Sequence, residues 1–376
     1  MAKLGEVCKL NMGQSPDSSS YNDTGDGIPF FQGNADFGEI HPNIRVWCNA
    51  PTKIAHPGEI LISVRAPIGA MNIADCECCI GRGLASISAD EAICTTKYLW
   101  YGISSKIEEL NAKGTGSTFK AINKKTLEET EIPIRDLMEQ ERIAANLDRV
   151  TALISLRKQQ LAKLNELVKA RFVEMFGEPV ANIANWPIER LEKHLTIIGG
   201  YAFKSDGFRA KGIPVLRIGN INSGYFQPTN MVYWHDDSTL ERYKMHPGDL
   251  VISLTGTVGK NDYGNVCILG NDYNEYYLNQ RNAKLELKET LNGIYLSELL
   301  KFPQIKGRLT GISRGIRQAN ISNKDILSLP ILIPPISLQK QFAAFVERVD
   351  RQKQTVQQSL EKLELMKKTL MQEYFG

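Results

Sequence analysis

The sequence predicts a mixed α/β (α+β) tandem repeat, in which two globular domains alternate with two long helices. Three observations lead to this prediction. Residues 136–177 match residues 335–376 without a gap, and 13 of the 42 aligned positions are identical. The regions that precede these two segments share short sequences in the same order. The matched segments are rich in helix-forming residues, whereas the preceding regions alternate short apolar runs with Gly, Pro and Asn.

The first globular domain is predicted over residues 1–135 and the second over residues 178–334. "HPGEILIS" (56–63) and "HPGDLVIS" (246–253) each place an apolar run after a His-Pro-Gly turn, which predicts a strand. Residues 96–110 and 291–309 have the spacing of amphipathic helices. Two further pairs of segments correspond, namely 28–34 with 213–220 and 120–134 with 319–333. Each domain is therefore expected to combine strands with helices.

The repeated segments 136–177 and 335–376 are predicted to be long helices that pack against each other. Neither Pro nor Gly occurs between Leu137 and Phe176, and apolar residues recur with a seven-residue period. Each copy is strongly apolar at the heptad position where the other is mixed. The alternative is that each helix packs only on its own domain. The predicted interface comprises Leu147, Val150, Ile154, Leu161, Leu164, Val168, Val349, Val356, Leu360, Leu363 and Leu370.

Composition indicates a cytoplasmic globular protein. Hydrophobic residues make up 42% and charged residues 23% of the 376-residue chain. No apolar run approaches the ~18–20 residues of a membrane helix, and residues 1–17 lack the apolar core of a signal peptide. The seven cysteines show no disulfide-like spacing. Because the net charge is only +3, binding to nucleic acid would depend on where the charges lie.

Two acid-free segments, 110–125 and 301–324, occur at matching positions of the repeat. Lys and Arg charges, hydroxyls and exposed backbone N–H groups are the groups that contact phosphates. Arg can also read guanine, and Asn or Gln can read adenine. The alternative is a pair of solvated surface loops. The candidates for DNA contacts here are Lys113, Thr115, Ser117, Lys120, Lys124, Arg308, Arg314, Arg317 and Gln318.

A second group of candidates lies at the ends of predicted strands in both domains. Each residue alone is as consistent with an ordinary turn as with a DNA contact, but their repeated position at strand ends favours an interface. These candidates are Arg65, Arg82, Thr257, Lys260, Asn261, Gln280 and Arg281.

The sequence carries no strong catalytic or metal-binding motif. "GTVGK" (256–260) lacks two positions of a phosphate-binding loop. A nuclease site combining Asp249, Glu286 and Lys288 is a weak alternative, because the first domain does not repeat it. Zinc binding by "CECC" (76–79) with Cys94 is also weak, since no second pair or nearby His completes the site. We therefore expect no catalytic residue and no metal site.

The chain resembles the specificity subunit of type I restriction–modification systems over its whole length. The resemblance rests on the duplicated plan, on the two His-Pro-Gly segments, and on "IPVLRIGN" (213–220). It rests also on the Ile/Leu-Pro entry into each long helix and on the trio Gln140, Arg142 and Ala144. "CECC" has no explanation in this resemblance.

The resemblance implies a function in DNA recognition. The domains 1–135 and 178–334 would be target-recognition domains that each read one half of a split site in double-stranded DNA. The two helices would pair antiparallel as a coiled coil, give the chain a pseudo-two-fold plan and set the gap between the half-sites. Two modification (methyltransferase) subunits and restriction (endonuclease and translocase) subunits would be partners. S-adenosylmethionine, ATP and Mg would bind to those partners and none to this chain. The alternatives are a single-chain DNA nuclease or methyltransferase, and a coiled-coil adaptor without a DNA role.

Overall fold

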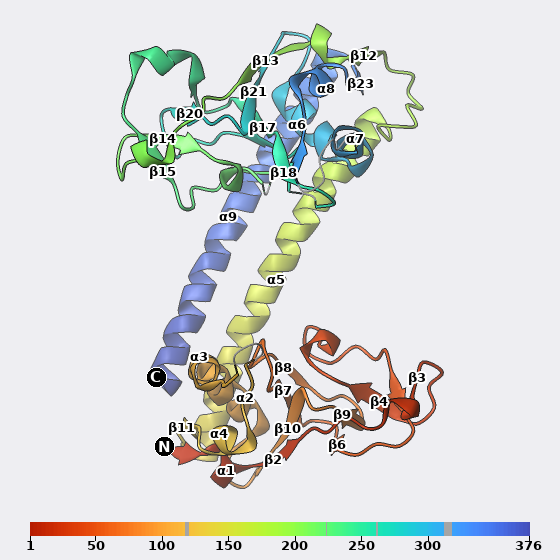
Figure 1. Ribbon diagram of the computed structural model, residues 1–376, viewed down its shortest axis with the longest axis vertical. Helices are drawn as coiled ribbons and strands as arrows, with labels where there is room; N and C mark the ends of the chain where they lie inside the picture. The colour runs from red at the N-terminus through yellow and green to blue at the C-terminus, as the bar shows by residue number, and fades with distance from the viewer. Residues whose placement is uncertain (117–119, 223, 261, 312–317) are drawn as a thin grey trace. The chain divides into compact units, whose positions relative to one another are not determined.

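The computed structural model describes residues 1–116, 120–222, 224–260, 262–311 and 318–376 (Figure 1). The chain divides into two compact units. Unit 1 comprises Met1–Lys158 with Gln357–Gly376, and unit 2 comprises Gln159–Val356. Each long helix therefore contributes one of its ends to each unit. No helix in these ranges is both long enough and apolar enough to cross a membrane.

Unit 1 contains eleven short strands and four short α-helices in its described residues. The strands are β1 (Ala2–Lys3), β2 (Cys8–Met12), β3 (Tyr21–Asn22), β4 (Ile28–Phe31), β5 (Trp47–Cys48), β6 (Ile54–Ala55), β7 (Ile60–Ser63), β8 (Met71–Ile73), β9 (Cys78–Ile80), β10 (Leu84–Ala89) and β11 (Glu131–Ile132). The helices are α1 (Leu4–Val7), α2 (Thr96–Ser105), α3 (Ile107–Lys113) and α4 (Lys124–Glu128).

The strands of unit 1 form two main sheets. The first sheet has the antiparallel order β2-β10-β7-β8, and the second has the order β3-β5-β4-β9-β6, in which β4 and β9 are parallel. A small pair, β1-β11, joins the start of the chain to the residues just before the first long helix. All four residues of β7 are buried, which fits its central position between β10 and β8.

Unit 2 repeats this plan. Its strands are β12 (Ile188–Arg190), β13 (Leu195–Gly199), β14 (Ile213–Leu216), β15 (Val232–Trp234), β16 (Lys244–Met245), β17 (Leu250–Ser253), β18 (Thr255–Thr257), β19 (Val266–Ile268), β20 (Tyr276–Leu278), β21 (Asn282–Leu287), β22 (Gln318–Asn320) and β23 (Pro330–Leu332). Its short helices are α6 (Gly293–Lys301), α7 (Pro303–Thr310) and α8 (Asn323–Leu327).

The sheet orders of unit 2 match those of unit 1, except that β3 has no counterpart among the described strands of unit 2. The order β13-β21-β17-β19 corresponds to β2-β10-β7-β8, and β15-β14-β20-β16 corresponds to β5-β4-β9-β6. The pair β12-β23 corresponds to β1-β11. A further pair, β18-β22, extends the plan in unit 2. The internal repeat in the sequence is therefore a repeat of strand topology as well.

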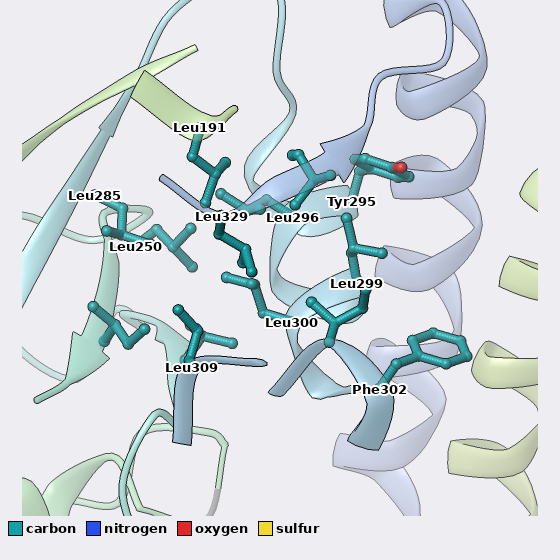
Figure 2. Close-up of a cluster of buried hydrophobic side chains, with 14 of the residues drawn as sticks. Leu191, Leu250, Leu285, Tyr295, Leu296, Leu299, Leu300, Phe302, Leu309 and Leu329 are labelled. Atoms are coloured by element: carbon teal, nitrogen blue, oxygen red, sulfur yellow. The ribbon is translucent and has the colours of Figure 1, made fainter. Parts of the chain in front are cut away.

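A cluster of buried leucines and aromatic rings forms the main core of unit 2 (Figure 2). Leu250 and Leu285 come from the first sheet, whereas Leu296 and Leu299 come from α6. The Phe172 ring, from the long helix, stacks on the Tyr295 ring of α6 with 5.5 Å between centroids. Burial of this apolar surface stabilises the packing of sheet, short helices and long helices as one body.

The long helices are α5 (Leu137–Phe176) and α9 (Ile336–Phe375). Asp136 caps the N-terminus of α5, because its carboxylate accepts a hydrogen bond of 2.9 Å from the N–H of Glu139. In unit 1, Nε of Arg157 lies 3.2 Å from Oγ of Ser359, and Lys158 lies 3.2 Å from Glu364. The start of α5 packs in the same core cluster as the end of α9. The two helices are therefore antiparallel.

Both predicted short helices are interrupted. The predicted helix 96–110 is α2 followed by α3, with a break at Lys106. The predicted helix 291–309 is α6 followed by α7, with a break at Phe302. Pro303 explains the second break, since proline disfavours helical geometry in the residue before it and occupies the first position of the next helix.

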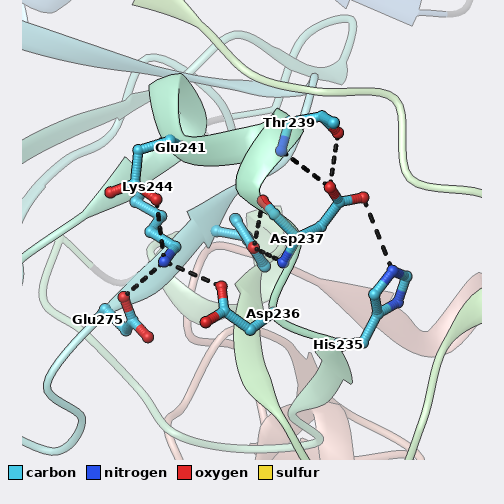
Figure 3. Close-up of polar contacts among 8 residues, drawn as sticks. His235, Asp236, Asp237, Thr239, Glu241, Lys244 and Glu275 are labelled. Carbon is cyan, nitrogen blue, oxygen red and sulfur yellow. Dashed lines mark hydrogen bonds and ion pairs between the residues drawn. The ribbon is translucent and has the colours of Figure 1, made fainter.

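A lysine on the edge strand of the second sheet of unit 2 forms ion pairs with three carboxylates (Figure 3). Nζ of Lys244, in β16, lies 3.0 Å from Asp236, 3.1 Å from Glu241 and 3.3 Å from Glu275. Hydrogen bonds from its ammonium to Asp236 and Glu241 raise the pKa of Lys244. The side chain is only 10% exposed, and it connects β16, the turn before it and the residue that precedes β20.

Candidate nucleic-acid interface

Unit 1 brings five chain segments together at one edge of its first sheet, which we call edge 1 (residues 13–14, 64–66, 82–83, 114–116 and 120–122). Ser63 ends β7 and is paired with Leu84, the first residue of β10. Beyond this pair, the N–H of Val64 donates to the carbonyl of Gly83 (2.9 Å), and the N–H of Ile122 donates to the carbonyl of Val64 (2.9 Å). Main-chain hydrogen bonds therefore fix the positions of the segments that contain Val64, Gly83 and Ile122.

Unit 2 has an edge held by the same main-chain bonds, which we call edge 2 (residues 200–201, 254–257, 280–281 and 318–321). The N–H of Leu254 donates to the carbonyl of Arg281 (2.8 Å), and the N–H of Ile321 donates to the carbonyl of Leu254 (2.8 Å). Leu254 is therefore the counterpart of Val64, and Arg281 is the counterpart of Gly83.

A glycine allows the chain to pass close to its neighbour at each edge. The N–H of Gly13 donates to the carbonyl of Leu84, and that of Gly200 donates to the carbonyl of Asn282. A Cβ atom on Gly13 would lie 2.2 Å from a main-chain carbonyl oxygen, and one on Gly200 would lie 2.1 Å from the equivalent oxygen. Only a residue without a side chain fits such contacts, so both glycines are required by the edge itself.

The edges bring together predicted residues that lie far apart in the sequence. Exposed side chains at edge 1 belong to Arg65, Arg82, Thr115 and Lys120, and those at edge 2 belong to Thr257, Gln280 and Arg281. Among the described residues, no carboxylate forms an ion pair with the three arginines or with Lys120. These cationic groups are therefore available to an anionic ligand such as a phosphate backbone.

A turn that begins at Thr257 of edge 2 holds one more predicted residue, Lys260. Thr257 donates through its N–H and its hydroxyl to the carboxylate of Asp262, at 2.8 Å in each case. The bond from the Thr257 N–H is the main reason that the pKa of Asp262 is lowered. Lys260 lies exposed in the same turn. The Thr257 hydroxyl therefore already has an acceptor, and it retains lone pairs for a further partner.

The predicted segments are less uniformly positive than their composition suggests. Lys113 pairs with Glu109 at 2.5 Å, and Lys124 pairs with Glu128 at 3.3 Å. In both cases the acid lies four residues away on the same short helix, a spacing that places the two side chains together. The expectation of uncompensated charge therefore needs correction at these two lysines.

Of the remaining predicted residues, one is exposed on a helix and five lie wholly or partly outside the described residues. Arg308 is exposed on α7. Ser117, Asn261, Arg314 and Arg317 lie outside the described residues, and so does the side chain of Gln318, whose backbone is part of β22.

The sequence analysis missed one residue of edge 2, Tyr201, and did not single out Lys306 within the acid-free segment 301–324. Tyr201 is 37% exposed, and its carbonyl accepts a hydrogen bond of 2.8 Å from the N–H of Gln280. Nζ of Lys306, on α7, donates to Oδ1 of Asn265 at 2.6 Å, and burial lowers the pKa of Lys306. An exposed aromatic residue beside basic side chains is a signal of nucleic-acid binding, because bases stack on aromatic rings.

The three residues considered for a nuclease site have separate partners. Asp249 forms an ion pair of 2.8 Å with Lys284, whereas Glu286 accepts a hydrogen bond from the Thr196 hydroxyl at 3.0 Å. Nζ of Lys288 donates to the carbonyl of residue 193 at 3.0 Å. Each of the three side chains therefore has a separate partner within the fold.

Two cysteines of the cluster, Cys78 and Cys79, are buried in two different places, whereas Cys76 is half-buried. Cys78 and Cys79 are consecutive residues of β9, so their side chains point to opposite faces of the sheet, where each belongs to a different core cluster. Burial raises the pKa of Cys78 to about 12. Across the described residues, no three His, Cys, Asp or Glu side chains are grouped as a metal site.

All of the residues predicted for the interface of the helix pair are buried or half-buried. In unit 1, Leu147 belongs to the core cluster that includes the end of α9, and in unit 2, Val168 and Val349 share a cluster. Arg171 places its guanidinium over the ring of Phe345 on the other helix. The buried members are Leu147, Val150, Ile154, Val168, Val349, Val356 and Leu360, and the half-buried members are Leu161, Leu164, Leu363 and Leu370.

Comparison with known proteins shows a family match. The family model described as "Type I restriction modification DNA specificity domain" matches residues 1–166 and again residues 184–365. The provisionally named type I restriction enzyme MjaX specificity subunit of Methanocaldococcus jannaschii is 43% identical over 161 residues, which are 43% of this chain and 38% of that protein. The MjaVIII specificity subunit of the same organism is 25% identical over 292 residues, 73% of this chain and 68% of that protein. The chain therefore spans well under half of the first relative.

A solved structure has the same fold over the whole chain. The type I restriction–modification S subunit from M. genitalium is 16% identical, and it covers 100% of this chain and 95% of its own with a TM-score of 0.61. This likeness confirms the predicted fold class of two mixed α/β domains with two long antiparallel helices.

Proposed function

The chain belongs to the type I restriction modification DNA specificity family, and we propose that it recognises double-stranded DNA as the specificity subunit of such a system. Each unit would recognise one half of a bipartite sequence. The observation that carries this proposal is the duplicated edge. The same main-chain bonds hold both copies, yet the exposed side chains differ, with Arg65 and Arg82 at edge 1 and Gln280 and Arg281 at edge 2. Two similar frames with different side chains suit two half-sites of different sequence.

The chemistry of the exposed groups supports binding to duplex DNA. Guanidinium groups form paired hydrogen bonds with guanine or with phosphate, and amide groups do so with adenine. Each phosphate contact releases condensed cations, so affinity should fall steeply with salt. Because the net charge is only +3, the effect should depend on a few placed cations rather than on the whole surface.

We also propose that partner subunits supply the chemistry. Two modification subunits would methylate the recognised DNA, and restriction subunits would cleave it. S-adenosylmethionine, ATP and Mg would then be bound by these partners, and this chain would bind none of them. Some apolar residues of α5 and α9, such as Leu156 and Leu365, lie outside the interface between the two helices and are exposed. Exposed apolar groups of this kind suit contact with another protein. The cell compartment would be the cytoplasm.

Selection from a library of random duplexes tests the proposal. The chain is mixed with a modification subunit of the same system, bound duplexes are recovered at moderate salt, and their sequences are compared. We expect two conserved half-sites around a stretch without preference. Recovery of duplexes without any shared sequence would contradict recognition. Methylation or cleavage of DNA by the chain alone would instead indicate a single-chain enzyme, and an unchanged weak affinity after Arg65, Arg82 and Arg281 are replaced by Glu would favour an adaptor without a DNA role.

A further inference from the structure

Arg82 and Gln280 occupy the same position in the two edges. The N–H of Gln14 donates to the carbonyl of Ile80 (3.0 Å) at edge 1, and the N–H of Tyr201 donates to the carbonyl of Leu278 (2.8 Å) at edge 2. These bonds make Ile80 and Leu278 counterparts, just as the bonds of Val64 and Leu254 make residues 83 and 281 counterparts. Because two residues separate the two anchor points in each unit, Arg82 corresponds to Gln280.

The backbone of each residue is fixed at this position while its head group remains free. The N–H of Arg82 donates to Oγ of Ser15 at 3.3 Å, and the N–H of Gln280 donates to the carbonyl of Tyr201 at 2.8 Å. Both residues are exposed. Within the described part of the chain, neither the guanidinium of Arg82 nor the side-chain amide of Gln280 has a hydrogen-bond or ion-pair partner.

Base recognition requires a residue whose backbone is held in place and whose side chain has two polar groups without another partner. These groups are either two donors, or one donor and one acceptor. An arginine can donate two hydrogen bonds to O6 and N7 of guanine, whereas a glutamine can pair with N6 and N7 of adenine. Both patterns are displayed in the major groove, where each base pair is distinguishable. Gln280 carries no charge, so it adds no electrostatic attraction to a phosphate, whereas its amide offers the donor and the acceptor that the edge of an adenine requires.

We propose that residues 82 and 280 are equivalent base-reading positions, at which Arg82 selects a guanine in one half-site and Gln280 selects an adenine in the other. This inference rests on the proposed function and goes further by naming the residue and the base in each half. The neighbouring Tyr201 occurs in unit 2 where unit 1 has Gln14, so the surroundings of the two readers also differ.

Reciprocal substitution tests the assignment. The full chain, in complex with its modification subunit, is compared in four forms by selection from random duplexes: unaltered, Arg82→Gln, Gln280→Arg, and Arg82→Lys. We expect Arg82→Gln to change one guanine to adenine in one half-site only, and Gln280→Arg to change one adenine to guanine in the other half only. Each preferred base should be favoured by on the order of 10- to 100-fold over its replacement.

The lysine variant separates base reading from phosphate binding. Lysine keeps the charge but loses the paired geometry of the guanidinium. If Arg82 reads a base, Arg82→Lys should reduce the preference for guanine, and if it binds a phosphate, the recovered sequences should be the same as for the unaltered chain.

The failure of this inference differs from the failure of the proposed function. If all four forms recover one and the same bipartite sequence, the chain recognises DNA but residues 82 and 280 do not read it, and the inference is overturned. If the unaltered complex recovers no shared sequence, the proposed function itself fails.

Discussion

Gln140 and Gln339 make the same set of hydrogen bonds, one residue in each unit, and both are fully buried. Oε1 of Gln140 accepts from the N–H of Thr95 at 2.9 Å, and Oε1 of Gln339 accepts from the N–H of Asn292 at 2.8 Å. Thr95 and Asn292 are the residues that cap the N-termini of α2 and α6. Each glutamine thus connects the first turn of a long helix to the start of a short helix in the adjoining domain.

The amide nitrogens complete the same arrangement. Nε2 of Gln140 donates to the carbonyls of Ile93 and Arg135, each at 2.8 Å. Nε2 of Gln339 donates to the carbonyls of Thr290 (3.2 Å) and Pro334 (2.8 Å). One side chain therefore satisfies three main-chain groups that would otherwise be buried without a partner.

We predict that Gln140→Leu and Gln339→Leu each destabilise the protein strongly. Leucine fills a similar volume but leaves three main-chain groups unsatisfied, at a cost of about 1–3 kcal/mol for each buried group. Thermal unfolding followed by circular dichroism should show a clear decrease in Tm for either variant. Gln159→Leu is the control, because Gln159 is exposed on α5. Equal Tm values for Gln140→Leu and the control would contradict the role of the network.

We predict that two leucines on α5 differ sharply in their contribution to stability. Leu147 is fully buried in the core cluster of unit 1, whereas Leu153 is 44% exposed. Leu147→Ala should lower the free energy of unfolding by about 2–5 kcal/mol, since a buried cavity remains, and Leu153→Ala should cost much less. Urea denaturation of both variants measures the difference. A cost for Leu153→Ala as large as that for Leu147→Ala would show that the seam residues are wrongly assigned.

We predict a stability loss at alkaline pH that depends on Cys267. Burial raises the pKa of this fully buried thiol from 9.0 to about 12. Between these values the unfolded chain has released the proton while the folded protein retains it, so the free energy of unfolding falls as pH rises, by up to about 1.4 kcal/mol per pH unit for one thiol. The decrease begins near pH 9, and none of this effect is expected below it.

The alanine variant isolates this thiol. Urea denaturation from pH 8 to pH 11 under reducing conditions should show a shallower decrease for Cys267→Ala than for the unaltered chain, whatever the difference at pH 8. Parallel curves over that range would show that the thiol titrates alike in both states.

We predict that Lys120 contributes to DNA affinity and Lys113 contributes little. Lys120 is exposed at edge 1, whereas Lys113 already pairs with Glu109. If Lys120 contacts one phosphate, Lys120→Ala should reduce the slope of log affinity against log salt by about 1, and Lys113→Ala should leave it nearly unchanged. Fluorescence anisotropy with a labelled duplex at several salt concentrations measures both slopes. An unchanged slope for Lys120→Ala would count against an interface at edge 1.

The long helices were predictable because their signals are local. Forty residues without Pro or Gly, in a seven-residue apolar pattern, gave the helices that the structure places at Leu137–Phe176 and Ile336–Phe375. The seven-residue pattern alone could not explain why Arg157 and Arg171 occupy the same heptad position as the interface residues Val150 and Leu164. The structure shows that each reaches a residue of the other helix, Ser359 and Phe345 respectively, so their role depends on the packed partner.

The edges were only partly predictable because insertions differ between the two halves. Gly13 and Gly200 are equivalent although 187 residues separate them, whereas Gln140 and Gln339 are 199 residues apart. A comparison at one fixed spacing therefore did not pair Gln14 with Tyr201, and the exposed aromatic residue at edge 2 was missed. The ion pairs of Lys113 and Lys124 depend on where short helices begin, which the sequence pattern defined poorly.

Because main-chain hydrogen bonds hold the two edges, the exposed side chains of the edges can change during evolution. Peptide groups and two glycines make the frame, so an exposed residue at position 82 or 280 can be replaced without disturbing the bonds that hold it. Substitutions there should cost little in folding. New preferences could then arise in one half of the molecule by single codon changes, while the inherited scaffold and the other half stay intact.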